Sequence, residues 1–160
     1  MEEEKFAQQL ATLRERWIAE GIACDRPATG ADVAAFEARY GVVLPSDIRA
    51  YFTTVNGTAI GAYGMEDEYL LGFWHLDEVR SFAEVFAGGS VRTPSPEEER
   101  TFVIADHSIW VYGFGIQLSA DPEAPTPIVA DVASPYHRVA ESFAEFLAAY
   151  LRGDEDMIYL

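Results

Sequence analysis

The spacing of apolar residues in the first third of the chain predicts three helices. Apolar side chains recur at intervals of three and four from Phe6 to Trp17, which predicts an amphipathic helix from Glu3 to Glu20. The same spacing predicts a second helix over Val33–Tyr40 and a third over Pro45–Asn56. The third helix should end in a turn, because the pair Asn-Gly adopts positive φ most readily.

Beyond this point the pattern changes to short runs of β type, separated by glycine, proline and polar residues. The predicted strands are Thr58–Gly64, Tyr69–Trp74, Phe102–Asp106, Ile109–Leu118 and Ile128–Val132. Two further helices are predicted, over Val79–Phe86 and over Arg138–Arg152. The proline-containing stretches Ser90–Arg100 and Ser119–Pro127 are predicted to be exposed loops.

Short turns rather than helical crossovers connect most of these strands, which favours antiparallel pairing. The sequence therefore predicts the α+β class, with a mostly antiparallel sheet of about five to six strands packed with helices. A length of 160 residues fits a single domain over residues 1–160, since no repeat or low-complexity tract divides the chain.

The segment Ala35–Gly57 carries the most recognisable pattern. It reads AFEARYGVVLPSDIRAYFTTVNG, two short helices joined by an extended kink, and we expect it to be structural, with Leu44 and Phe52 buried. At least one residue of Asn56-Gly57 should have positive φ. The order apolar-Phe-Glu, Tyr-Gly, Leu-Pro-x-Asp, aromatic pair, Asn-Gly resembles the signature of the SUKH superfamily. That family includes fungal cell-wall synthesis regulators and many bacterial immunity proteins that neutralise polymorphic toxins.

Later motifs extend the resemblance to residues 30–152, the family-like core of the chain. The matching segments are Leu71–Phe73, Leu76–Val79, Val103–Asp106 and Ser142–Leu147. The predicted helix at residues 3–20 lies outside this core and is interpreted as an addition to it. The resemblance implies a SUKH-like fold and a protein that binds partners without catalysing a reaction.

The formal net charge of −16 narrows the choice of partner. A strongly acidic protein repels nucleic acid and anionic lipid surfaces and attracts basic proteins. Only 11 lysine and arginine residues occur, and they are not clustered. We therefore expect no nucleic-acid or membrane partner and favour a basic protein, although acidic surfaces also serve solubility alone.

Cysteine usage and the first residues of the chain bear on the compartment. Cys24 is the only cysteine, so no internal disulfide is possible, and packing is its more common role than catalysis. Met1 to Glu4 carry the wrong charge for a signal peptide. No apolar run approaches the roughly 20 residues that span a bilayer. We expect a soluble, cytoplasmic protein.

The sequence supplies no coherent catalytic set. Asp106-His107-Ser108 are consecutive and would diverge on a turn, and no Gly-x-Ser-x-Gly elbow is present. Asp106 is better interpreted as the cap of a turn. Possible metal ligands lack recognised spacing: His75, His107, His137, Asp106 and Asp131. The segment 113–115 lacks the features of a phosphate loop. We predict no enzymatic activity, no metal and no other cofactor.

Acidic clusters and aromatic residues are the remaining candidates for function. Solvation would explain the clusters and core packing would explain the tryptophans, but together they could form an acidic face bearing aromatic anchors. Trp110 and Tyr136 are further aromatic residues that could face either core or solvent. The predicted partner-binding residues are Glu66, Asp67, Glu68, Trp74, Asp77, Glu78, Glu97, Glu98, Glu99 and Tyr112.

Two functions follow from these observations. The first is an immunity protein that binds a cognate toxin, expected to be basic, and blocks its active site without any residue reacting. The alternative is an interaction or regulatory module of the same fold that has no toxin partner. Fungal members carry long disordered arms, which residues 1–160 do not include, and this favours the first function.

Overall fold

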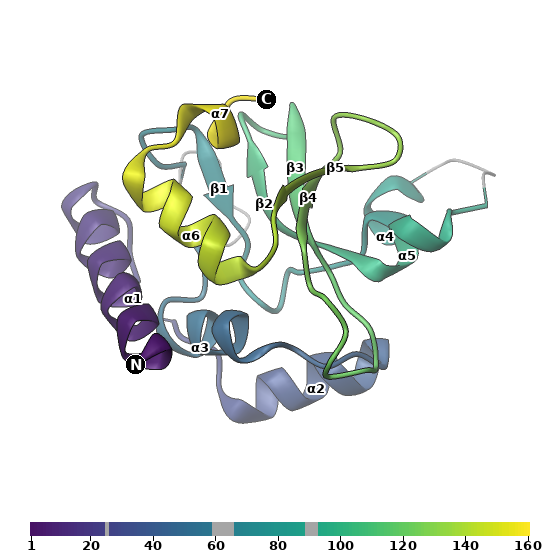
Figure 1. Cartoon of the computed structure of the whole chain (residues 1–160), viewed down its shortest axis with the longest axis horizontal. Coiled ribbons are helices and arrows are strands. Elements are labelled where there is room, and N and C mark those ends of the chain that lie inside the picture. The colour runs from purple at the N-terminus through teal and green to yellow at the C-terminus, as the bar shows by residue number, and fades with distance from the viewer. Residues whose placement is uncertain (25, 59–65, 89–92) are drawn as a thin grey trace.

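The computed structural model of the chain describes residues 1–24, 26–58, 66–88 and 93–160 (Figure 1). Its helices are α1 (Glu2–Ala19), α2 (Gly30–Tyr40), α3 (Ser46–Thr54), α4 (Phe82–Phe86), α5 (Pro96–Arg100), α6 (Phe143–Arg152) and α7 (Glu155–Ile158). Its strands are β1 (Leu71–Phe73), β2 (Thr101–His107), β3 (Tyr112–Gln117), β4 (Ile128–Ala130) and β5 (His137–Ala140). The predicted strand Thr58–Gly64 lies outside the described residues apart from Thr58.

Helix α1 buries the apolar stripe that its sequence predicts. Leu13 and Trp17 are fully buried, and the Trp17 ring lies 5.1 Å from the ring of Phe73 in β1. Near the start of α1, Phe6 meets Phe143 of α6 edge to face. Helix α1 shares one hydrophobic core with the sheet.

The segment Ala35–Gly57 has the predicted features. Leu44 and Phe52 are buried, and both Asn56 and Gly57 have positive φ, at 55° and 82°. The side chain of Asn56 donates to the Arg26 carbonyl at 2.7 Å and accepts from the Leu76 amide at 2.8 Å. Asn56 therefore fastens the loop before α2 to the segment after β1, which is a structural role.

The strands form one antiparallel sheet in the order β1-β2-β3-β4-β5. Each strand pairs with its neighbours in sequence, as the short connections predict. Register shifts occur between Val103 and Ala105 in β2 and between Ile128 and Val129 in β4. The predicted single-domain α+β fold with an antiparallel sheet is confirmed.

The prediction of an exposed loop over Ser90–Arg100 is wrong for Pro96–Arg100, which form helix α5. Ser95 accepts from the amide of Glu98 at 3.2 Å, and the Glu98 side chain accepts from the Ser95 amide at 3.3 Å. Pro96 follows at the first helical position, where its missing N–H is not needed. Capping therefore overrides the proline content that indicated a loop.

The prediction that the final helix begins at Arg138 is wrong. Residues His137–Ala140 form β5, and α6 begins only at Phe143, where the Ser142 hydroxyl accepts from the Glu145 amide at 3.1 Å. An apolar residue just before a helix fits both helical and strand spacing, so spacing extended the helix too far. Helix α7 was not predicted, and its single turn is too short to give a periodic signal.

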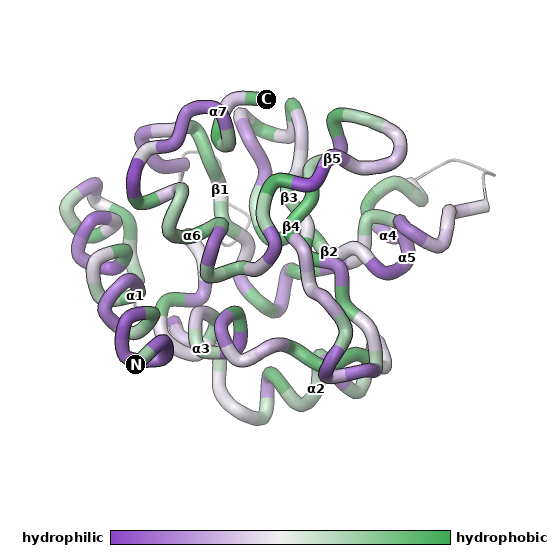
Figure 2. Tube along the Cα trace, viewed as in Figure 1, coloured by the Kyte–Doolittle hydropathy of each residue, from purple (hydrophilic) through white to green (hydrophobic). Residues whose placement is uncertain are grey.

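The helices are unequally distributed over the sheet (Figure 1). Phe146 of α6 packs against Phe73 and Phe114, with ring centroids 6.4 and 5.3 Å apart, so α6 covers one face, which we call the inner face. In Figure 2, α1 alternates between hydrophilic and hydrophobic residues, as expected of a helix with one buried side. The other face, which we call the outer face, carries Trp74 and Gly113. No helix in the described ranges is long and apolar enough to cross a membrane.

Candidate partner-binding surface

The acidic turn before β1 contains three predicted partner-binding residues, and the structure separates them. Glu68 is exposed and pairs with Arg16 of α1, while Glu66 is half-buried and accepts from the Ile109 amide at 3.0 Å. Asp67 is only 5% exposed. The prediction of an exposed acidic triplet is therefore wrong for Asp67.

Asp67 is buried because its carboxylate organises the backbone that enters β1. One oxygen accepts from the amides of Tyr69 and Leu71, at 2.8 and 3.0 Å. The other accepts from the hydroxyl of Tyr150, which in turn accepts from Trp17 Nε1 at 3.0 Å. Burial raises the pKa of the Asp67 carboxyl despite these hydrogen bonds. This network joins α1, α6 and β1, and it is a structural feature.

Tyr112 also differs from its prediction, because it lies on the inner face of the sheet. It is buried, and its ring stacks on His107 with centroids 4.8 Å apart. Its hydroxyl donates to the Ile158 carbonyl and accepts from the Leu160 amide at 3.3 Å. Tyr112 therefore holds the last residues of the chain against β3 and offers no surface to a partner.

Trp74 belongs to a group of aromatic rings on the outer face, which we call the outer aromatic cluster. Its members are Trp74, Phe82, Phe86, Trp110 and Tyr136. Neighbouring centroids within it lie 5.2 to 6.0 Å apart. Phe82 is buried at its centre, and the other rings are half-buried.

The Asp106 carboxylate accepts hydrogen bonds from two members of this cluster. One carboxylate oxygen accepts from Trp74 Nε1 at 2.7 Å, and the other accepts from the backbone amide of Trp110 at 3.2 Å. The predicted turn-capping role of Asp106 is confirmed, and the same side chain also fixes an indole. Asp106 therefore fixes the Trp74 indole and the backbone of Trp110.

Glycines in β3 make room for the rings. A Cβ at Gly113 would lie 2.9 Å from the Trp110 ring, and one at Gly115 would lie 2.5 Å from the Phe82 ring. The sequence indicates this space, since positions 113 and 115 lie on the same face of a strand and both are glycine. The sequence predicts Trp74, Trp110 and Tyr136 as candidate aromatic residues, whereas it predicts Phe82 and Phe86 only as part of a helix.

The remaining predicted residues lie on α5 or in the segment between β1 and α4. Glu97 is half-buried and accepts from the amide of Tyr136 at 3.2 Å, which places a carboxylate at the cluster. Glu98 completes the capping box of α5, and Glu99 is exposed. Glu78 is half-buried in the segment that leads from β1 to α4.

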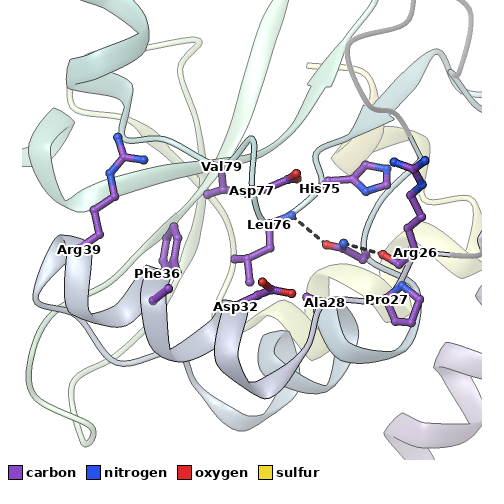
Figure 3. Close-up of a pocket in the computed structure, with 12 residues that line it drawn as sticks. Arg26, Pro27, Ala28, Asp32, Phe36, Arg39, His75, Leu76, Asp77 and Val79 are labelled. Carbon is purple, nitrogen blue, oxygen red and sulfur yellow. Dashed lines mark hydrogen bonds between the residues drawn. The ribbon is translucent and has the colours of Figure 1, made fainter.

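Asp77 lies on the rim of a pocket of about 420 Å³ between α2 and the segment after β1 (Figure 3). The floor of the pocket is apolar and includes Leu76. Arg26 and Arg39 lie toward its two ends, with Asp32 between them (Figure 3). The pocket lining therefore carries two arginines and two aspartates.

The residues considered for chemistry have other roles or lie apart. Asp131 accepts from the Gly113 amide at 2.6 Å, and burial raises the pKa of its carboxyl. His137 is exposed on β5, His75 lines the pocket, and Cys24 is buried. Among the described residues, no three histidine, cysteine or acidic side chains group closely enough to hold a metal ion.

Comparison with known proteins gives one clear result. The sequence profile of the SMI1 / KNR4 family (SUKH-1) matches residues 27–149, from the loop before α2 to the last turns of α6. No curated protein matches the chain. The matched range includes the sheet and the outer aromatic cluster, whereas α1 and α7 lie outside it.

Proposed function

The chain belongs to the SMI1 / KNR4 family (SUKH-1), and we propose that it is a non-enzymatic immunity protein that binds and neutralises a cognate bacterial toxin. The toxin would present a basic surface, because the net charge of this chain is −16. The protein would act in the cytoplasm, where a toxin that reaches the cell interior must be blocked.

One observation supports a binding function above all others, the half-buried outer aromatic cluster with a carboxylate at its edge. Tryptophan and tyrosine are the residues that most often dominate the energy of protein interfaces. Glu97 borders the cluster at Tyr136, the exposed Glu99 lies on the same helix as Glu97, and the exposed Asp77 follows Trp74 by three residues. Aromatic anchors with acidic neighbours complement a basic surface that contains apolar gaps.

The mechanism requires no reacting residue. Asp106 already holds Trp74 and Trp110 in place, so binding orders few side chains and loses little conformational entropy. The bound protein would cover the active site of the toxin or a basic patch beside it. Specificity would come from the acidic residues and loops around the anchors, which can also repel the wrong toxin.

The proposal is tested by co-expressing this protein with the product of each adjacent gene that encodes a toxin-like protein. We expect growth to be rescued and an equimolar complex to form with a catalytically inactive toxin. An unrelated protein of similar size and acidity is the control, because it tests whether charge alone rescues growth. Toxicity that this protein does not reduce would contradict the proposal. A stable complex with a harmless partner would instead support the regulatory alternative.

A further inference from the structure

The turn between β2 and β3 has an unusual backbone. Ser108, Ile109 and Trp110 are consecutive and all left-handed, with φ of 50°, 53° and 65°. This conformation is rare for β-branched and large aromatic residues, because Cβ approaches a backbone carbonyl oxygen. Glycine or asparagine would adopt it with less strain. Fold stability alone therefore does not explain isoleucine at position 109.

The strained turn is held firmly by hydrogen bonds to its backbone amides. Ser108 donates to the Leu70 carbonyl at 2.8 Å, and Ile109 donates to Glu66 at 3.0 Å. The Trp110 amide donates to the Asp106 carboxylate at 3.2 Å, and the Val111 amide donates to the His107 carbonyl at 2.8 Å. Four successive amides are thus satisfied, and the turn is preorganised. Strained backbone held in this way is concentrated at functional sites.

The conformation separates the side chains of the turn. The Trp110 ring lies over Gly113 in the outer aromatic cluster, whereas Ile109 and Val111 are 66% and 70% exposed. Leu70 also has positive φ and is 47% exposed. Its carbonyl accepts the hydrogen bond from the Ser108 amide of the turn. We call Leu70, Ile109 and Val111 the apolar tip.

We propose that the apolar tip is a contact site for the partner, and that it inserts into an apolar pocket on a basic protein. This inference rests on the proposed function and assigns it a surface. The chemistry of the partner follows from charge, because the net charge of the chain is −16 and the Glu66 carboxylate lies against the Ile109 amide of the tip. A partner would present lysine or arginine around an apolar depression. The tip adjoins the outer aromatic cluster through Trp110, so both surfaces can contact one partner.

The first test replaces the exposed side chains. The probe is a catalytically inactive form of the toxin that this protein neutralises in the co-expression test, and its binding is measured by interferometry. The double variant Ile109→Ser, Val111→Ser should raise the dissociation constant about 30-fold, the effect expected of an interface hot spot. The matched control is Ile18→Ser, because Ile18 is 54% exposed on α1, and it should leave binding unchanged.

The second test separates recognition from folding. Asparagine tolerates left-handed φ, so Ile109→Asn should leave the melting temperature unchanged or raise it. The same change should weaken binding at least about tenfold if Ile109 enters a pocket of the partner. A lower melting temperature with unchanged binding would show that Ile109 is only structural, and would overturn the proposal.

The remaining outcomes are also decisive. If the wild-type protein binds and the double variant binds equally well, the apolar tip is not the contact site, but the proposed function stands. If the wild-type protein does not bind the probe, both proposals fail. Analytical ultracentrifugation completes the test, since a dimer abolished by Ile109→Asn would assign the tip to a second copy of this chain.

Discussion

At the scale of single residues, Gly57 occupies a position that a side chain does not fit. Its φ is 82°, and a Cβ added there would lie 2.6 Å from the Phe73 carbonyl oxygen and 2.8 Å from that of Trp74. These atoms belong to the backbone around the end of β1 and cannot move aside individually. The close approach explains why the conspicuous Asn56-Gly57 pair is structural.

Substitution of Gly57 by alanine should therefore cost more than the left-handed conformation alone. Gly21→Ala is the matched control, because Gly21 has the same φ of 82° and open space around its Cα. We expect Gly21→Ala to lower the free energy of unfolding by about 1–2 kcal/mol. Gly57→Ala should lose about 2 kcal/mol more through overpacking. Equal losses in urea unfolding would show that the predicted clash is relieved.

Asp67 makes a prediction about pH. Burial raises the pKa of its carboxyl in the folded protein above the unfolded value of about 3.9. The folded state then holds the proton more tightly than the unfolded state. The stabilisation from this proton is complete below the unfolded pKa and is lost as pH rises through the folded pKa.

The variant Asp67→Asn removes this titration while keeping the size of the side chain. The free energy of unfolding of the wild type, minus that of the variant, should fall as pH rises from about 4. Urea unfolding at several pH values measures the difference. Because both proteins share all other titrating groups, a difference that stays constant with pH would contradict a raised pKa at Asp67.

At the scale of elements, α1 lies outside the family match yet contributes fully buried side chains. Leu13→Ala should lower the free energy of unfolding by about 2–5 kcal/mol, because it leaves a cavity in the hydrophobic core. Ile18→Ala is the control on the same helix, since Ile18 is exposed, and it should change stability by about 0.5 kcal/mol or less. Similar effects of the two substitutions in chemical unfolding would show that α1 is not part of the core.

Elements were predictable where one signal dominated. The spacing of apolar residues predicted helix α1, and the glycine of the Asn56-Gly57 pair predicted the turn. The start of α6 did not follow from spacing, because β5 precedes it with apolar residues compatible with either period. The candidate site was harder still. Asp67 and Glu68 are adjacent acidic residues, and hydrogen bonds from the local backbone and from the distant Tyr150 bury Asp67 while Glu68 stays exposed.

At the scale of the whole molecule, charge governs the approach of a partner. A net charge of −16 should accelerate association with a basic protein at low salt. Raising the salt concentration from about 0.01 to 0.15 M shortens the screening length from about 30 to 8 Å. The association rate constant should fall over this range, while the dissociation rate constant changes less. Stopped-flow association without salt dependence would remove the electrostatic argument for a basic partner.

The two edges of the sheet have a further consequence. On the free side of β1, Phe73 already exchanges hydrogen bonds of 2.9 Å with the amide and hydroxyl of Thr58. At the other edge, β5 is short, and His137 and Arg138 are exposed on it. Short, charged or occupied edges discourage strand addition. If the protein binds a partner as proposed, side chains rather than strand addition would carry the recognition, so point substitutions could change the preferred partner while the backbone stays unchanged.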